Sequence, residues 1–229
     1  MDRSAYHHQS KLDVLLGRDF WSHIQGKTVI HFGCGSGSDS IEMFRRGASH
    51  VVGLDSNTSR LDEARRRLRG DENIQFVTST HIKADVIVSV DAFEHYGDPA
   101  KVLEQMAELL KPDGSIHISF GPTWYHPLGG HIFSVVPWAH LIFTEKALIR
   151  WRNDFRSDGA TRFSEVEGGL NQMTIKRFKR LVEVSPFELA EFHTRPIRVV
   201  RSLANPLTRE FLTATVRCVL TFKPVVKPG

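Results

Sequence analysis

The chain has few cysteines and no long hydrophobic run. Only two of its 229 residues are cysteine, too few for a disulfide framework, and this favours a reducing compartment. Its longest apolar stretch, residues 131–143, is shorter than the roughly 20 residues of a membrane span and contains a proline. The first ten residues lack the apolar core of a secretion signal. We therefore expect a cytoplasmic protein without a membrane span.

The sequence also lacks a strong charge of either sign. Its formal net charge is +4, and its densest basic run, residues 60–70, interleaves acids as a solvated helix face does. No basic stripe studded with aromatic residues accompanies the charge, so nucleic acid is not an expected partner. Hydrophobic residues make up 41% of the chain, which suits one globular domain with a sizeable core.

Strand and helix patterns alternate through the first half of the chain. The predicted elements are strands 28–32, 50–54, 73–78, 84–90 and 115–120 with helices 38–46, 58–69 and 98–110. The strands are nearly continuous apolar runs, as expected where helices cover both faces of a parallel sheet. A helical N-terminal extension is predicted over residues 1–26, with leucines at helical spacing. These patterns predict an α/β fold.

The alternation stops after Phe120. About fifty residues rich in Trp, His, Phe, Gly and Pro intervene before the next regular helix, which Thr174 caps. Two late strands follow, around residues 187–200 and 213–223. We therefore predict an insertion at about residues 121–173.

A glycine-rich turn joins the first strand to the next helix in VIHFGCGSGSDSIEMF, residues 29–44. Such a turn brings backbone N–H groups close to a nucleotide ligand. The dinucleotide fingerprint places its third glycine where Ser38 stands, and no Walker lysine follows the turn. Asp55 ends the second strand, where an acid accepts hydrogen bonds from ribose hydroxyls in NAD and S-adenosylmethionine sites alike. A turn that needs positive φ, with Asp55 as a cap, is the structural alternative.

Three segments in this order resemble the class I S-adenosylmethionine-dependent methyltransferases, especially the branch acting on small molecules. They are HFGCGSGSDS, VVGLD and VIVSVDAFEHYGDPAKVLEQMAELLKPDGSIHISF. The resemblance covers residues 27–120, and more weakly the helix at residue 174 and the last strands. It implies a Rossmann-like, doubly wound, mostly parallel seven-stranded sheet with helices on both faces. The methyltransferase domain would span residues 27–229.

The resemblance also implies a cofactor site. Its residues would be Gly33, Cys34, Gly35, Gly37, Asp55, Ser56, Ser79, Thr80, Val90 and Asp91. Asp55 would bind the ribose hydroxyls, Ser56 would lie beside the adenine, and Asp91 would lie near the methionine amino end. Ser79 stands where the family often has an acid that binds the adenine amino group, so Thr80, His81 or a backbone carbonyl would have to substitute.

Methyl transfer from a sulfonium needs a base only where the acceptor is a hydroxyl or a protonated amine. His95 follows the fourth strand, at the sheet edge where open α/β folds bind ligands. His131, with His126 and His140, lies in the aromatic insertion, where this family builds its acceptor pocket. His95 and His131 are the candidate catalytic residues, and packing of a loop or lid is the alternative for each. No metal-ligand spacing is present, so no metal is expected.

These features predict a methyltransferase that acts on an O or N atom of a small molecule, with S-adenosyl-L-methionine as cofactor. An NAD-dependent oxidoreductase and a non-catalytic cofactor-fold binding or assembly module are the alternatives. The apolar insertion suits a hydrophobic acceptor, with a buried interface as the alternative. The arginines at positions 150–162 suit an acidic acceptor, with a plain solvated helix end as the alternative. Homodimerisation through the apolar segment 121–145 is a further expectation.

Overall fold

A computed structural model describes residues 9–130, 133, 136–155, 159–165 and 170–224 of the chain. These residues contain one seven-stranded sheet with the strand order β3-β2-β1-β4-β5-β7-β6. In chain order the strands are β1 (Thr28–Phe32), β2 (His50–Leu54), β3 (Ile74–Val77), β4 (Ala84–Val90), β5 (Leu110–Phe120), β6 (Phe187–Pro196) and β7 (Thr213–Phe222). Only β7 runs antiparallel to its neighbours, β5 and β6. The predicted mostly parallel, doubly wound sheet is confirmed.

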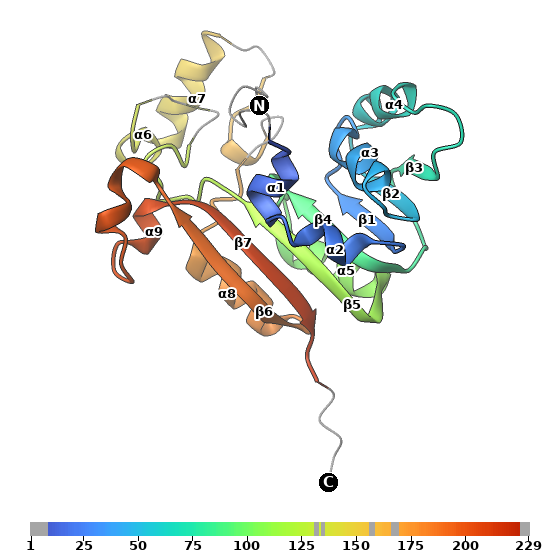
Figure 1. Cartoon of the computed structure of the whole chain (residues 1–229). Helices are drawn as coiled ribbons and strands as arrows, with labels where there is room; N and C mark the ends of the chain where they lie inside the picture. The colour runs from blue at the N-terminus through green and yellow to red at the C-terminus, as the bar shows by residue number, and fades with distance from the viewer. Residues whose placement is uncertain (1–8, 131–132, 134–135, 156–158, 166–169, 225–229) are drawn as a thin grey trace.

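Helices cover both faces of this sheet (Figure 1). The helices are α1 (Lys11–Leu16), α2 (Phe20–Ile24), α3 (Ser38–Arg45), α4 (Thr58–Arg66), α5 (Pro99–Leu109), α6 (Ala139–Ile142), α7 (Glu145–Asn153), α8 (Ile175–Val184) and α9 (Arg209–Leu212), with 3-10 turns η2 (Phe93–His95), η3 (Phe163–Glu165) and η4 (Arg198–Leu203). Val29 and Ile30, neighbours in β1, are both fully buried but belong to different clusters. Val29 packs with α1 to α4, and Ile30 packs with α5 and α8.

The N-terminal extension forms two short helices, with the break at Gly17. Ser10 caps α1 by accepting from the Leu12 N–H at 3.1 Å, and the leucines of α1 are buried against the sheet. Asp19 forms an ion pair with Arg217 of β7 at 3.0 Å, which ties the extension to the other end of the chain. Residues 11–16 and 20–24 of the predicted helical extension are helical, and residues 1–8 lie outside the described part.

Some predicted boundaries were wrong. The helix predicted over 58–69 ends at Arg66, and the Arg67 and Leu68 N–H groups donate three residues back in a tightened last turn. The strand predicted over 187–200 ends at Pro196, which cannot donate to the ladder, and η4 follows. β5 begins at Leu110 rather than residue 115, since Leu110 pairs with Ala84 before the chain bulges and resumes pairing.

The segment between β5 and α8 contains a regular helix that the sequence pattern did not predict. α7 starts where Thr144 accepts from the Ala147 N–H at 3.3 Å, and it buries Leu148 and Ile149. These side chains form a third hydrophobic cluster with Phe133 and Phe163, separate from the two clusters on the sheet. The segment 121–173 therefore carries a small core of its own.

Candidate functional site

The glycine turn lies at the carboxyl ends of β1 and β2. The Gly33 and Cys34 N–H groups both donate to the carbonyl of Leu54, at 2.8 and 3.0 Å. The Gly35 N–H donates to Asp55 Oδ2 at 2.8 Å. Asp55 is thus joined to the turn by its side chain, and the two residues that the sequence placed in one site are in contact.

The three glycines of the turn all have positive φ, but their surroundings differ. A Cβ on Gly33 would lie 2.6 Å from the Ala92 Cβ, and one on Gly37 would lie 2.5 Å from the Phe76 ring. A Cβ on Gly35, where φ is +54°, would meet no atom within 4 Å. Packing therefore excludes a side chain at Gly33 and Gly37, whereas Gly35 exposes its backbone to open space that a ligand can enter.

The Asp55 carboxylate keeps free acceptor capacity. Oδ2 accepts from Gly35 and Oδ1 accepts from the Asn57 N–H, each at 2.8 Å. A carboxylate has about four lone-pair positions, so each oxygen can accept one more hydrogen bond. Asp55 is only half-buried. It can therefore bind a pair of vicinal hydroxyls such as those of a ribose.

Asp91 directly follows β4, which neighbours β1, so it also lies at the carboxyl ends of the strands. It has φ of +50°, a left-handed conformation that is uncommon outside glycine, and its N–H donates to the Ser119 carbonyl at 2.9 Å. Its Oδ2 lies 3.1 Å from Lys11 Nζ, an ion pair without hydrogen-bond alignment. Lys11 Nζ also binds Asp39 Oδ2 at 3.2 Å.

Lys11 lies at the candidate site, and the sequence did not reveal it. Burial alone lowers the pKa of its ammonium, but the carboxylates of Asp39 and Asp91 together raise that pKa above its ordinary value. The three residues come from α1, the first turn of α3 and the end of β4. Nothing in the local pattern around Lys11 indicates that α1 delivers it to the end of β4.

Glu94 is a buried acid next to Asp91. Its Oε1 accepts from the Gly121 N–H at 3.1 Å, and its Oε2 has no partner among the described residues. Burial, reinforced by the charge of Asp91, raises the pKa of Glu94 to about 8. The group is therefore mostly a neutral carboxylic acid at pH 7, and it holds the start of the insertion against the turn η2.

His95 lies half-buried in η2, beside Glu94. The Asn171 side-chain amide fixes this turn by donating to the carbonyls of Phe93 and Tyr96, at 2.8 and 2.9 Å. The following helix α5 is capped by Asp98, which accepts from the Lys101 N–H. Asp98 thus caps α5, and the catalytic role of His95 stays a prediction beside the alternative that it packs this loop.

The Tyr96 hydroxyl also lies at the carboxyl ends of the strands, and no sequence pattern indicated it. It contacts the Ser89 hydroxyl at 2.9 Å and would be 3.3 Å from a Cβ on Gly33. Burial raises the pKa of Tyr96 above its ordinary value, so the phenol stays protonated. No local sequence pattern indicates that Tyr96 lies beside Gly33, because this contact depends on how η2 folds back.

The remaining predicted cofactor residues occupy different environments. The Cys34 side chain packs into the core and burial raises its thiol pKa to about 12, so only its backbone faces the turn. Val90 is buried at the end of β4, and Ser56 is exposed beside Asp55. Ser79 is exposed and Thr80 half-buried, in the loop after β3, whose last residue Val77 pairs with Leu54.

Two of the three insertion histidines have structural contacts. His140 donates through its Nε2–H to the Trp124 carbonyl at 2.6 Å, and His126 Nδ1 accepts from the Leu128 N–H at 3.0 Å. Burial lowers the pKa of both rings, so both are neutral. His131, the predicted catalytic residue of this segment, lies outside the described residues.

Two further observations concern the described residues alone. Their His, Cys, Asp and Glu side chains form no group of three that could hold a metal ion. None of their helices is long and apolar enough to cross a membrane. Arg152, expected at a solvated helix end, is instead buried with its guanidinium 5.9 Å from the centre of the Phe133 ring.

Comparison with known proteins identifies relatives of this chain. A family described as a methyltransferase domain matches residues 6–183. A ubiquinone biosynthesis O-methyltransferase of Aeromonas salmonicida is 36% identical over 103 residues, 41% of this chain and 43% of the relative. The alignment thus spans less than half the length of that relative.

Solved structures show the same fold at low sequence identity. An S-adenosylmethionine-dependent methyltransferase of Methanosarcina mazei superposes with a TM-score of 0.60 at 17% identity, covering 90% of this chain and 98% of that one. One from Mesorhizobium loti gives 0.57 at 18% identity, covering 86% and 92%. Both likenesses extend well beyond the 27–120 region of the sequence resemblance.

Proposed function

The chain belongs to the class I S-adenosylmethionine-dependent methyltransferases, and on this premise we propose that it transfers a methyl group to a hydroxyl oxygen of a small-molecule acceptor. The family match sets aside the NAD-dependent alternative. Oxygen is preferred over nitrogen because the curated relative is named an O-methyltransferase. The structural observation that supports the proposal most directly is the Asp55 carboxylate fixed against an open glycine turn.

The residues at the strand ends fit the cofactor of this family. S-adenosylmethionine supplies an activated methyl group on a sulfonium. Gly35 offers open backbone, and Asp55 offers two unused acceptor positions for the ribose hydroxyls. Lys11 and Asp91 offer one cation and one carboxylate for the two charged groups of an amino acid. The exposed loop at Ser79 has no acid for the adenine amino group, so adenine contacts there would come from hydroxyls or backbone.

The work left to the protein is to position the acceptor and exclude water. Three aromatic rings pack together in the insertion. The Phe163 ring centroid lies 4.3 Å from that of Phe133 and 5.8 Å from that of Trp124. Trp124 follows Gly121 by three residues in the chain, and Glu94 holds Gly121 at the end of β5. We propose that this aromatic cluster forms one wall of the acceptor pocket, and that the acceptor is an apolar phenol-like molecule.

A base is needed to remove the hydroxyl proton. His95 and His131 are the proposed candidates, and Glu94 is not, because its pKa of about 8 leaves it protonated at neutral pH. Replacing His95 with Ala should lower kcat at least tenfold with little change in the affinity for S-adenosylhomocysteine, the demethylated product. His131→Ala provides the parallel comparison. Equal loss of turnover and product affinity in a variant would indicate that its histidine packs the site.

Calorimetric titration with S-adenosylhomocysteine tests the cofactor site. Asp55→Ala should weaken binding by about 1–3 kcal/mol, because it removes an acceptor and releases two backbone donors. Asp62→Ala, at an exposed acid on α4, is the matched control and should bind as the parent chain does. Unchanged affinity in Asp55→Ala would remove Asp55 from the site.

Turnover distinguishes an enzyme from a binding module. The parent chain is offered simple catechols and longer-chain phenols, and transfer of a labelled methyl group is measured. Methylation of an amine but no phenol would contradict O-transfer. Saturable product binding without turnover on any acceptor would favour the non-catalytic alternative.

We also propose a reducing, cytoplasmic setting for the protein. Both cysteines, Cys34 and Cys218, are free and buried, which suits a compartment where thiols stay reduced. A homodimer through segment 121–145 is the competing expectation for this apolar segment, and light scattering at increasing protein concentration would test it.

A further inference from the structure

The connection between β6 and β7 exposes an unusual amount of apolar surface. Val199, Leu203 and Leu207 are 91%, 60% and 90% exposed. The connection is folded, since Thr208 Oγ1 donates to the Leu203 carbonyl at 2.6 Å. Single exposed aliphatic residues are common, but three within nine residues of an ordered segment indicate an interaction surface.

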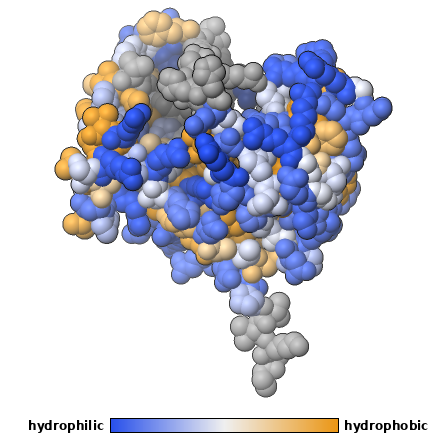
Figure 2. All heavy atoms as spheres, in the orientation of Figure 1, coloured by the Kyte–Doolittle hydropathy of each residue, from blue (hydrophilic) through white to orange (hydrophobic). Residues whose placement is uncertain are grey.

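This surface continues onto the insertion. The rings of Phe211 in α9 and Tyr125 lie 5.3 Å apart, and Trp138 Nε1 donates to the Tyr125 carbonyl at 3.1 Å. From Trp138 the chain enters α6, where Ile142 is 69% exposed. Figure 2 shows apolar residues gathered on the left side of the molecule, where Figure 1 places α6 and α9. We call the connection 197–212 and the α6 segment 136–143 together the apolar face.

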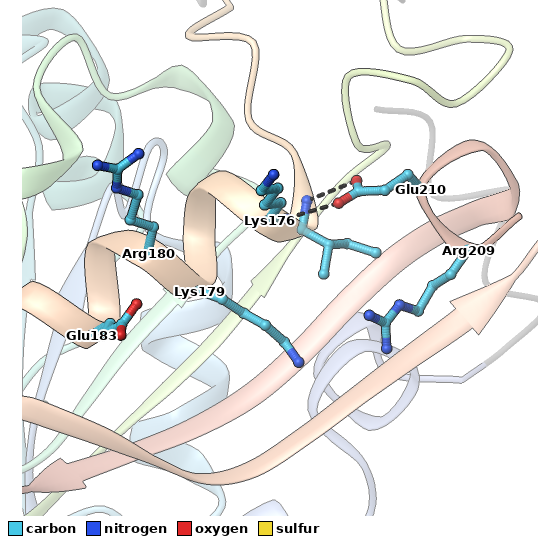
Figure 3. A pocket seen from close by; sticks show the side chains of 7 residues that line it. Lys176, Lys179, Arg180, Glu183, Arg209 and Glu210 are labelled. Carbon is cyan, nitrogen blue, oxygen red and sulfur yellow. Dashed lines mark hydrogen bonds between the residues drawn. The ribbon is translucent and has the colours of Figure 1, made fainter. Parts of the chain in front are cut away.

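The apolar face is bordered by positive charge. Residues 195–212 contain four arginines, at positions 195, 198, 201 and 209, and one acid, Glu210. The Glu210 carboxylate is already bound to the Ile175 and Lys176 N–H groups at the start of α8, at 3.0 and 2.8 Å (Figure 3). Among the described residues none of the four guanidinium groups forms an ion pair. The face therefore presents uncompensated cations beside exposed aliphatic side chains.

A basic cavity adjoins this face. It has a volume of about 430 Å³ and lies between α8 and α9, with Lys176, Lys179, Arg180 and Arg209 among its lining residues (Figure 3). The Arg209 Nε atom is buried and has no hydrogen-bond partner among the described residues. Two acids, Glu183 and Glu210, also line the cavity, and the Glu210 carboxylate is bound to the start of α8. The four basic side chains outnumber these acids, so the cavity favours an anionic group such as a phosphodiester.

We propose that the apolar face docks on the surface of a bilayer that contains anionic phospholipids. Val199, Leu203 and Leu207 enter the boundary between headgroups and acyl chains, and the arginines bind headgroup phosphates. The basic cavity accepts one such headgroup. This combination of aliphatic tips and unpaired cations is complementary to an anionic membrane surface.

A second copy of the chain is a poorer occupant of the same face. In a two-fold symmetric pair each surface meets its own copy, so the arginine clusters would face each other.

The location of the face also favours a membrane. Thr123, two residues before Tyr125, bonds to the carbonyls of Glu210 and Thr213, and Gly121 bonds to Glu94 at the strand ends. Docking would thus bring the start of the insertion close to the lipid.

Vesicle flotation tests this proposal without cofactor or acceptor, so its result is independent of the proposed function. The full chain is mixed with phosphatidylcholine vesicles, with or without about 30 mol% phosphatidylglycerol. We expect at least about tenfold more bound protein with the anionic lipid, and a large loss of binding at about 0.5 M NaCl. Equal binding to both vesicle types, or to neither, would overturn the proposal.

Substitutions locate the binding surface. Val199→Asp combined with Leu207→Asp, and Arg198→Glu combined with Arg201→Glu, should each lower vesicle binding at least about tenfold. Val184→Asp, at the opposite end of α8, and Arg66→Glu, on α4 across the molecule, are the matched controls and should bind as the parent does. Vesicle binding that survives both double substitutions would contradict the assigned surface.

Two accompanying measurements keep these results interpretable. Every variant position is exposed, and thermal unfolding with S-adenosylhomocysteine titration checks that each variant folds and keeps its cofactor site. Light scattering without vesicles reports self-association. A stable dimer that the apolar-face substitutions dissociate would show that a second copy occupies the face, and would overturn membrane docking.

Discussion

At the scale of single residues, the buried acid Glu94 has the clearest energetic consequence. Its pKa is raised by burial to about 8, whereas the unfolded chain ionises it near 4.5. Between these values the native state binds the extra proton, so stability from this group is complete at low pH and declines as pH rises to 8. The linked free energy is roughly 4 kcal/mol by pH 8.

Glu94→Gln removes this titration while keeping an acceptor for the Gly121 N–H. As pH rises from 5 to 8, the unfolding free energy of the parent should fall and that of the variant should not. Measured with denaturant, the difference between the two should grow by several kcal/mol in favour of the variant. Glu104→Gln, at an exposed acid of α5, should run parallel to the parent. A constant difference between Glu94→Gln and the parent would mean that Glu94 ionises normally in the native state.

The glycines of the turn should separate stability from binding. Gly37→Ala forces a Cβ to within 2.5 Å of the Phe76 ring at a positive φ, and should cost at least about 2 kcal/mol of stability. Gly35→Ala meets no atom within 4 Å and should cost about 1 kcal/mol, but it fills open space that the proposed cofactor would enter. Gly35→Ala should therefore lose more product affinity than stability. The reverse ranking in denaturation and calorimetry would contradict this assignment.

At the scale of elements, the two helix caps Thr174 and Thr144 belong to different cores. Thr174 accepts from the Arg177 N–H at 3.0 Å and starts α8, whose Phe178 lies in the main core. Thr144 starts α7, which packs only in the insertion cluster. Loss of either hydroxyl should destabilise its own helix by about 1 kcal/mol.

We expect the two losses to be measured differently. Thr174→Ala should lower the global unfolding free energy, whereas Thr144→Ala should speed amide exchange in α7 and leave global unfolding unchanged. A global loss from Thr144→Ala would show that the insertion unfolds together with the sheet.

The sequence predicted the central elements because each one has its own local signal. The apolar runs of β1, β2 and β4 match the structure end for end, and Asp98 with Pro99 marks the start of α5. α7 was missed, because its nine residues bury a narrow stripe on a small cluster and expose Trp151. The early end of β6 at Pro196 depends on its pairing with β7, which no local pattern encodes.

Site residues, like the helices and strands, could be predicted only where a local sequence pattern indicates them. The glycine turn and Asp55 carry a spacing signal in one stretch of chain, and the structure places them in hydrogen-bonding contact. Lys11 and Tyr96 reach the site only through tertiary packing of α1 and η2, so sequence patterns could not indicate them. The apolar face likewise requires the Tyr125–Phe211 contact between segments far apart in the chain.

At the scale of the whole molecule, buried histidines make the fold sensitive to acid. His117 of β5 packs against Phe20 and His23, and burial, with His23 and Arg217 nearby and Asp19 opposing them, lowers its pKa to about 3. The native ring therefore stays neutral while the unfolded chain takes up a proton below pH 6.5. Stability should fall as pH drops from 6.5 towards 3, by about 3 kcal/mol at pH 4.

His117→Gln retains a partner for the Ser115 hydroxyl, which lies 3.1 Å from the native His117 ring, and cannot titrate. Its unfolding free energy should decline less steeply than that of the parent between pH 6.5 and 4, in denaturant titrations at several pH values. His193→Gln, at an exposed histidine of β6, should keep the parent slope. Identical slopes for all three chains would exclude His117 as a source of acid sensitivity.

The hydrogen bonds of the glycine turn bear on the kinetics of ligand capture. Leu54 and Asp55 hold three successive N–H groups of the turn, at Gly33, Cys34 and Gly35. A loop already held in this way loses little conformational entropy when a ligand arrives. The association rate should then be limited by diffusion rather than by ordering of the loop. Differences in affinity between related nucleosides should therefore appear in their dissociation rates.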